Sequence, residues 1–437
     1  MDTIGPEGQS RKCLDTRKAN DKSRFPAKLS IKEGLQRPLI GVLKSRIEEM
    51  IELLSFAIVT HVFATGPAQE LEQYLKSRAR KVVFIGHPFS YLEDCRSFYR
   101  EYAVGRMVKS KTGFLWNLPG PLIYVKDLCH TVLWILSCGH AFDVYIGADN
   151  LNAFAGILLR HIGRVNKVVF YTIDYVPQRF RNTVLNKVYH MLDRFCVRHC
   201  NYVWNLSAAM ITERERKGYM KGSHASQVIV PIGTHFTQIK RLPFEKINRR
   251  HLVYLGHFRP GQGLKLIMKS IPVIMKTVPD AKLILVGTGP MEDELARMAG
   301  DLGIGENVKF SGFIKDHSEV ERILTRCAIG LAPYEPDVNS FTWYADPSKP
   351  KQYLACGLPV IITRVPQIAD TIESMHAGIA IRYSEEALAE AAIKLLTDDE
   401  FFEKCREKAI KLASEFEWDT IFERALMRVL NSHIYSS

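Results

Sequence analysis

The sequence has no apolar run long enough to cross a membrane. Its most apolar stretch, Pro121 to Ser137, is interrupted by Lys126, Asp127 and His130, whereas a membrane-spanning helix needs about 20 consecutive, mostly apolar residues. The first 15 residues also show no apolar region of the kind that directs secretion. The sequence therefore predicts a cytoplasmic protein with no membrane span.

Cysteine pairs that would build a disulfide framework or a zinc site are also missing. The nine cysteines are an odd number and are scattered, mostly within apolar runs. Cys196, His199 and Cys200 have one-turn spacing, but no second ligand pair accompanies them, and a structural zinc ion needs four ligands. We expect free thiols in a reducing compartment and no bound metal.

Positive charge is concentrated in one half of the chain. Residues 1–240 contain 34 basic and 20 acidic residues, a net charge of +14, whereas residues 241–437 contain 25 and 27, a net charge of −2. A basic excess attracts polyanions such as nucleic acid, anionic lipid or phosphorylated substrates, although it can also be a solvated surface that keeps a protein soluble.

The hydrophobic pattern predicts an α/β protein with two doubly wound, Rossmann-like domains in tandem and a cleft between them. Apolar runs that suit buried parallel strands alternate with helical patterns, first over residues 45–235 and again from His251. The predicted parts are a basic flexible tail (1–40), a first Rossmann-like domain (41–240), a linker (241–250), a second Rossmann-like domain (251–415) and a C-terminal helix that packs back across the domains (416–437).

A lysine-bearing helix start is the most informative feature of the second domain. Pro347 and Ser348 are suited to open a helix that Gly357 ends, and Lys349 and Lys351 lie in its first turn. Lysine opposes the helix dipole there unless an anion is bound, and a phosphate at this end would meet free backbone N–H groups and an ammonium. The alternative is a solvated pair of lysines at an exposed helix start.

The run PSKPKQYLACGLPV, residues 347–360, resembles the donor-nucleotide site of GT-B glycosyltransferases of family 4, and more narrowly the bacterial polysaccharide glucuronosyltransferases. The resemblance is good over residues 251–428 and weaker over residues 45–240. It implies that the helix start holds the diphosphate of a UDP- or GDP-linked sugar, with Ser348 and Lys349 as contacts, and that no separate cofactor is needed. Gln352 stands where the family has a glutamate on the ribose, and its amide still offers one acceptor.

Glycine-rich loops accompany two of the predicted strands. After the first strand of the second domain the resemblance implies a diphosphate clamp, and here Arg259, Gly261 and Gly263 occupy that loop while His257 and Gln262 replace the family's cations. In the first domain, Gly66 follows the first strand, where the family lines its sugar site. His235 takes a position in the interdomain hinge. These glycines also fit plain turns.

Asp174 is the candidate catalytic base. It follows the apolar run KVVFYTI, and a carboxylate at the carboxyl end of a parallel strand faces the ligand side of the sheet. It is the only acidic residue between Asp149 and Asp193, so this stretch offers no substitute. Inverting glycosyl transfer needs a base for the acceptor hydroxyl. A capping role, or pairing with Arg179 or Arg181, is the alternative.

These features favour an enzyme that transfers a hexosyl or glucuronosyl group from a nucleotide diphosphate sugar to a lipid-linked or polysaccharide acceptor. We expect it to lie peripherally on the inner face of the plasma membrane, because the basic first half would meet anionic lipid, and aromatic and basic residues mix between Phe98 and Lys126. That segment also fits a loop folded over the core. The alternatives are a nucleic-acid-binding protein, which would show a reader module that we do not find, and a GT-B chain that has lost donor binding.

Overall fold

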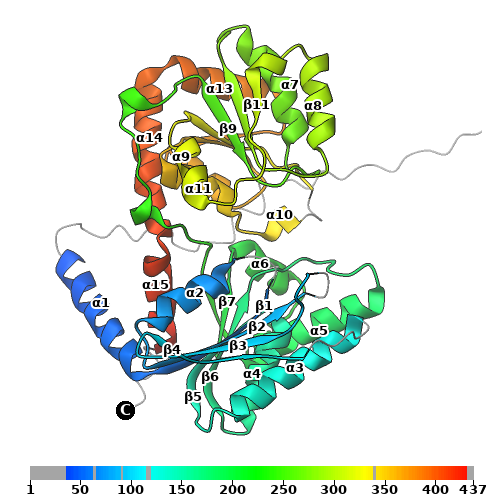
Figure 1. The fold of residues 1–437 in the computed structure, drawn as a ribbon, viewed down its shortest axis with the longest axis vertical. Helices are drawn as coiled ribbons and strands as arrows, with labels where there is room; N and C mark the ends of the chain where they lie inside the picture. The colour runs from blue at the N-terminus through cyan, green and yellow to red at the C-terminus, as the bar shows by residue number, and fades with distance from the viewer. Residues whose placement is uncertain (1–35, 63–64, 90–91, 115–119, 338–340, 431–437) are drawn as a thin grey trace, which may run out of the picture. The chain divides into compact units, whose positions relative to one another are not determined.

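The computed structural model describes residues 36–62, 65–89, 92–114, 120–337 and 341–430. By internal contacts the chain divides into Met1–Arg46 and Ile47–Ser437. The second unit contains two β-sheets, each covered by helices (Figure 1). Of the tail predicted over residues 1–40, residues 1–35 lie outside the described residues, and residues 36–40 begin helix α1, Gln36–Leu53.

The N-terminal lobe is built on a sheet with the strand order β4-β3-β2-β1-β5-β6-β7-β8. Its strands are β1 (Ser55–Val62), β2 (Lys81–Pro88), β3 (Phe98–Ala103), β4 (Arg106–Thr112), β5 (Phe142–Ala148), β6 (Val165–Thr172), β7 (Tyr202–Asn205) and β8 (Ser226–Ile229). Its helices are α2 (Pro67–Lys76), α3 (Gly120–Leu136), α4 (Asn150–His161), α5 (Thr183–His199) and α6 (Ala208–Arg216). The strands β1, β2, β5, β6, β7 and β8 pair in parallel.

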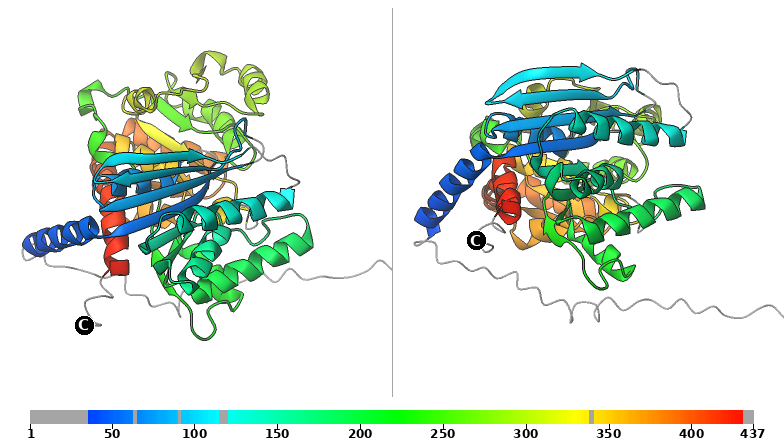
Figure 2. Two further views of the ribbon diagram at one scale, coloured as in Figure 1. Left: turned by 60° about the horizontal axis from the view of Figure 1, so that its bottom comes forward. Right: turned by 90° about the horizontal axis from the view of Figure 1, so that it is seen from below.

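The described residues between Phe98 and Lys126 mostly form strands and a helix. Strands β3 and β4 pair antiparallel and extend the sheet at its edge, and helix α3 follows them (Figure 2). The mixture of aromatic and basic residues that suggested an interfacial patch therefore belongs to an edge hairpin and the helix after it, and every residue of β4 except Lys111 is exposed.

The C-terminal lobe carries a second sheet with the order β11-β10-β9-β12-β13-β14, all parallel. Its strands are β9 (His251–Leu255), β10 (Lys282–Val286), β11 (Val308–Phe310), β12 (Ile329–Ala332), β13 (Val360–Thr363) and β14 (Gly378–Ile381). Its helices are α7 (Leu264–Met275), α8 (Glu292–Asp301), α9 (His317–Leu324), α10 (Phe341–Tyr344), α11 (Ser348–Cys356), α12 (Ile368–Ser374), α13 (Glu385–Thr397) and α14 (Asp399–Ala413). Short 3-10 turns lie at Phe236–Gln238, Phe244–Lys246, Gly305–Asn307 and Ser414–Phe416. Two doubly wound sheets confirm the predicted fold class.

The central parallel strands of each sheet are buried on both faces, which is why they read as continuous apolar runs. In β1, Phe56 and Ile58 pack with α2 on one face, whereas Ala57 and Val59 pack with α4 and α5 on the other. Successive side chains of a strand point to opposite faces, so a strand covered on both sides must be apolar throughout. This arrangement leaves the carboxyl ends of the strands as the places where polar side chains collect.

The C-terminal helix α15, Trp418–Leu430, packs against α2 of the N-terminal lobe. The rings of Phe422 and Tyr74 lie 5.6 Å apart, and Arg78 forms an ion pair with Asp419 at 2.8 Å. The apolar residues that the sequence places on one face of α15 thus join the core of the first sheet.

Candidate active site

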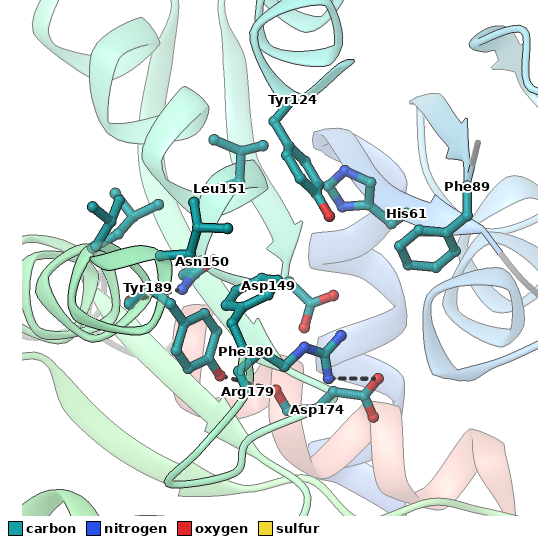
Figure 3. Close-up of a pocket in the computed structure, with 13 residues that line it drawn as sticks. His61, Phe89, Tyr124, Asp149, Asn150, Leu151, Asp174, Arg179, Phe180 and Tyr189 are labelled. Atoms are coloured by element: carbon teal, nitrogen blue, oxygen red, sulfur yellow. Dashed lines mark hydrogen bonds and ion pairs between the residues drawn. The ribbon is translucent and has the colours of Figure 1, made fainter. Parts of the chain in front are cut away.

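Two carboxylates meet at the carboxyl end of the first sheet. Asp149 directly follows β5 and Asp174 follows β6, its parallel neighbour. Together with His61 at the end of β1, they line a cavity of ≈ 240 Å³, which we call the first cavity (Figure 3). The cavity has a polar base and walls of apolar and aromatic residues from α3, α4 and α5.

Arg179 joins the two carboxylates. Its Nη1 lies 3.6 Å from Asp174 Oδ2, and Figure 3 shows the guanidinium between the two acidic side chains. Burial first, and then the charge of Asp174, raise the pKa of Asp149 to about 6. A carboxyl group with a perturbed pKa in an apolar-walled cavity is a common feature of functional sites.

Asp149 also adopts an unusual backbone conformation. Its φ is 69° and its ψ is 164°, and its backbone N–H donates to the Tyr171 carbonyl at 2.9 Å. A non-glycine residue at this φ costs about 1–3 kcal/mol and persists where the surroundings hold it. Asp149 lines the same cavity as Asp174, so a second carboxylate comes from outside the stretch in which the sequence offers Asp174 alone.

Helix α5 holds the loop that carries Asp174 and Arg179. Asn186 Oδ1 accepts hydrogen bonds from the backbone N–H groups of Arg179, at 2.8 Å, and Phe180, at 3.2 Å. The Tyr189 hydroxyl donates to the carbonyl of Asp174 at 3.2 Å. One helix face thus fixes the position of the loop by hydrogen bonds to its backbone, which leaves the acidic side chain directed into the cavity.

A second cavity of ≈ 250 Å³ lies beside the first. It is lined by Arg259, Ser348 and Lys349 of the C-terminal lobe, and by Asp174 of the N-terminal lobe. Asp174 therefore lines both cavities. Of the residues proposed from sequence, the structure brings these four together, and Gln262 joins them.

Lys349 forms no ion pair with a carboxylate within the described ranges of the chain. Its Nζ donates to Gln262 Oε1 at 3.1 Å and lies 3.9 Å from the ring centre of Tyr254. Burial, and then the charge of Arg259, lower the pKa of Lys349 to about 7. Two cations beside a helix start form a site that an anion would stabilise.

Lys351 does not contribute to this anion site. It is buried and forms an ion pair with Asp346, and its Nζ donates to the Ile232 carbonyl at 2.6 Å. The lysine pair of the helix start is therefore neither solvated nor equivalent, because Lys349 alone of the two lines the second cavity.

Gln352 lies near a third cavity, of ≈ 280 Å³, which is lined by Gly256, His257 and His317 among others. Its Nε2 lies 2.8 Å from His317 Nε2. Gln352 thus contacts the wall of the third cavity and is not among the residues that line the second.

The glycines serve different purposes. Gly263 starts α7 with φ 73°, and a Cβ there would lie 1.8 Å from the Pro333 carbonyl oxygen, so only glycine fits. Gly261 has φ 85° and open space around it. Gly66 precedes α2 and its N–H donates to Gln69 Oε1 at 3.0 Å; it lines none of the three cavities, whose described residues come from other segments.

His235 lies where the chain passes from β8 toward the second lobe. Its Nε2 is 3.3 Å from Glu70 Oε2, and this hydrogen bond with Glu70 raises the pKa of the histidine. It lines none of the three cavities among the described residues.

Residues 237–412 match the family model described as glycosyl transferases group 1. They form a group 1 glycosyltransferase domain. This domain contains the second sheet, the loop with Arg259 and helix α11 with Lys349, so it includes most of the second and third cavities. The resemblance drawn from the residues 347–360 is thereby confirmed for the group 1 family.

Relatives and solved structures agree with this assignment. The glycosyltransferase YqgM of Bacillus subtilis is 24% identical over 49% of this chain and 59% of its own length. A GDP-mannose-dependent phosphatidylinositol monomannoside mannosyltransferase of Mycolicibacterium smegmatis is 27% identical over 35% and 40%. The chain thus spans about half the length of the curated relatives it matches.

Two solved structures share the whole fold. Sucrose-phosphate synthase of Thermosynechococcus elongatus has a TM-score of 0.62 at 16% identity and covers 88% of this chain and 100% of its own. Anabaena HepE in complex with UDP and glucose has a TM-score of 0.62 at 17% identity and covers 87% and 100%. The fold is the two-lobed GT-B fold of glycosyltransferases.

Sequence reasoning missed Asp149 and the aromatic wall of the first cavity. Asp149 carries the same signal as Asp174, a carboxylate immediately after a buried apolar strand, FDVYIGA. The wall residues, such as Tyr124 and Phe180, come from segments whose position depends on the tertiary fold.

Proposed function

We propose that this protein transfers a hexosyl or glucuronosyl group from a UDP- or GDP-linked sugar to a hydroxyl group of a lipid-linked or polysaccharide acceptor. The observation that carries the proposal is that Asp174 lines both the first and the second cavity. An acceptor hydroxyl in the first cavity and a donor sugar in the second would meet beside this carboxylate.

The second cavity suits the donor diphosphate. Lys349, Arg259 and the N-terminus of α11 supply positive charge and N–H donors at one place. The same groups would stabilise the negative charge that develops on the diphosphate as it leaves. The third cavity, next to Gln352 and His317, would take the nucleoside.

The first cavity suits the acceptor. Asp174 takes the proton of the acceptor hydroxyl while that oxygen bonds to the anomeric carbon, and the bond from this carbon to the diphosphate breaks with its electron pair leaving on the phosphate oxygen. Configuration inverts in this single displacement. Arg179 positions Asp174, and Asp149 forms the second acidic group of the site.

The basic N-terminal half favours an anionic membrane as the place where the acceptor is met. Within the described ranges no helix has the length and hydropathy needed to span a bilayer. We therefore propose peripheral attachment at the inner face of the plasma membrane and no role in nucleic-acid binding.

Calorimetric titration with a panel of UDP- and GDP-sugars tests the donor. One member should bind with an affinity that Lys349→Ala lowers, and it should be consumed when a hydroxyl acceptor is present. If no nucleotide sugar binds, the second candidate applies, a GT-B chain that has lost its donor. That candidate is favoured by His257, Gln262 and Gln352, which replace the charged residues of the family.

A further inference from the structure

Helix α3 buries its two charged side chains and exposes several apolar ones. Lys126 and Asp127 are buried and form an ion pair at 2.9 Å. Leu122, Val125 and Leu133 are 50%, 55% and 62% exposed, whereas Ile135 packs in the core. A surface helix of a soluble protein normally exposes its charged side chains and buries its apolar ones, so the exposed apolar side chains of α3 are unusual.

An exposed apolar surface on α3 and α5 reaches the first cavity. We define the rim as the exposed apolar residues in the first turns of α3 and along α5: Leu122, Tyr124, Val125, Val184, Leu185, Val188 and Met191. Tyr124, Leu185 and Val188 also line the cavity. The rim is therefore continuous with the walls of the cavity, and Figure 3 shows Tyr124 on the α3 side of it. An acceptor that fills the cavity must pass this rim.

The charges near the rim identify its occupant. Arg181, Lys187 and Arg194 are exposed on α5 and the turn before it. The single acidic residue of each helix, Asp127 in α3 and Asp193 in α5, is buried against a cation. An apolar surface with cations and no exposed carboxylate is complementary to an anionic lipid surface. A second copy of the chain is disfavoured, because a symmetric contact would bring the same cations together.

We propose that the rim inserts into the interface of an anionic bilayer, so that the first cavity opens toward the lipid and receives a membrane-resident acceptor. The hydroxyl end of this amphiphile reaches Asp149 and Asp174, and its hydrocarbon part stays along α3 and α5. The identity of the reacting end rests on the proposed function, whereas the docking of the rim does not.

Sedimentation with vesicles of phosphatidylglycerol and phosphatidylcholine tests the rim. The test variant replaces four rim residues that do not line the cavity: Leu122→Ser, Val125→Ser, Val184→Ser and Met191→Ser. The matched control, Met107→Ser with Val108→Ser, removes apolar side chains of similar exposure, 58% and 57%, from the edge strand β4. The rim variant should lose at least about tenfold in partitioning, because it removes four apolar side chains that would be buried in the lipid interface. The control should bind as the wild type does.

The cations are tested separately. Replacing Arg181, Lys187 and Arg194 by glutamine should weaken binding by about fivefold per residue at low salt, and the difference should disappear at about 0.5 M salt. The loss caused by the rim variant should persist at high salt, because burial of apolar surface is not screened.

Nucleotide binding by the same preparations separates this proposal from the proposed function. Wild-type protein that binds a nucleotide sugar but no vesicles overturns the membrane proposal and leaves the donor site intact. Vesicle binding that the rim variant retains also overturns it. If the rim variant instead changes the sedimentation coefficient from dimer to monomer, the rim is a contact between copies of the chain and the proposal is wrong. Vesicle binding with no nucleotide binding counts against the proposed function alone.

Discussion

Lys349 should make nucleotide binding depend on pH. Its pKa is lowered to about 7 in the unliganded protein by burial and by the charge of Arg259, and a bound diphosphate would raise that pKa again. The affinity for a nucleoside diphosphate should then fall as the pH rises above 7, by up to about tenfold per unit. The phosphate is already fully ionised in this range because its last pKa is about 6.

The perturbation is Lys349→Ala. A charge-assisted hydrogen bond contributes about 1.5–3 kcal/mol, which corresponds to an increase of about tenfold to 150-fold in Kd at pH 7. Because the pKa of Lys349 is lowered from 10.5 to about 7, burying this amine costs folding free energy, in full below about pH 7 and progressively less up to pH 10.5, so the alanine variant should remain folded. It should also show no dependence of Kd on pH between 7 and 9.

Isothermal titration of UDP and GDP at pH 7, 8 and 9 measures both effects. Lys269→Ala is the matched control, since Lys269 is an exposed lysine of the same lobe that pairs with Glu385 at 3.4 Å. A Kd that is unchanged in folded Lys349→Ala, or a wild-type Kd that is flat from pH 7 to 9, would refute the assignment of the diphosphate to α11.

Three other predictions concern the remaining polar groups. Asp174→Asn should keep nucleotide binding and lower turnover by about 10² to 10⁴. Near-normal turnover with retained anomeric configuration in the product, checked by NMR, would exclude Asp174 as the base. A lowered Tm with normal turnover per folded molecule would indicate a capping role. Asp149→Asn should stabilise the protein at pH 8 by about 3 kcal/mol. The pKa of the folded carboxyl is raised to about 6, so its ionisation costs stability as the pH rises from about 4 to 6, and the cost remains above pH 6. Denaturant unfolding at pH 5 and 8 checks this, and equal stability of the two proteins at pH 8 contradicts it. Gln352→Glu should keep or improve donor affinity in calorimetry, whereas a clear loss at neutral pH would show that the amide binds a different donor group, such as an acidic sugar.

Most of the fold could be predicted from the sequence because buried parallel strands form continuous apolar runs. Runs such as KVVFYTI and AKLILVG became β6 and β10 within a few residues. The edge hairpin β3–β4 was missed because neither of its strands is a continuous apolar run. Strand β4 is almost wholly exposed, and β3 carries Arg100 and Glu101 between aromatic residues.

The residues of the candidate site could be predicted only where one short segment contains several of them. Ser348 and Lys349 follow each other at a helix start, and the structure places both in the second cavity. Lys351 has the same local pattern as Lys349, yet it is buried against Asp346. Which of two lysines faces a ligand depends on the rotation of α11 against its neighbours, and that is set by tertiary packing.

The two aspartates show why sequence cannot rank candidates that share one signal. Both follow a buried strand, and β5 and β6 are adjacent and parallel, so their carboxyl ends must lie close together. The two aspartates differ in their burial, in the strained backbone that only Asp149 has, and in the position of Arg179 beside Asp174. Asp174 reaches both cavities, whereas Asp149 lines the first one only. A base must reach the acceptor oxygen where this oxygen meets the donor carbon, so position selects Asp174. Burial, and then the charge of the neighbouring Asp174, raise the pKa of Asp149, and removing the Asp149 carboxylate should raise stability without creating a new base.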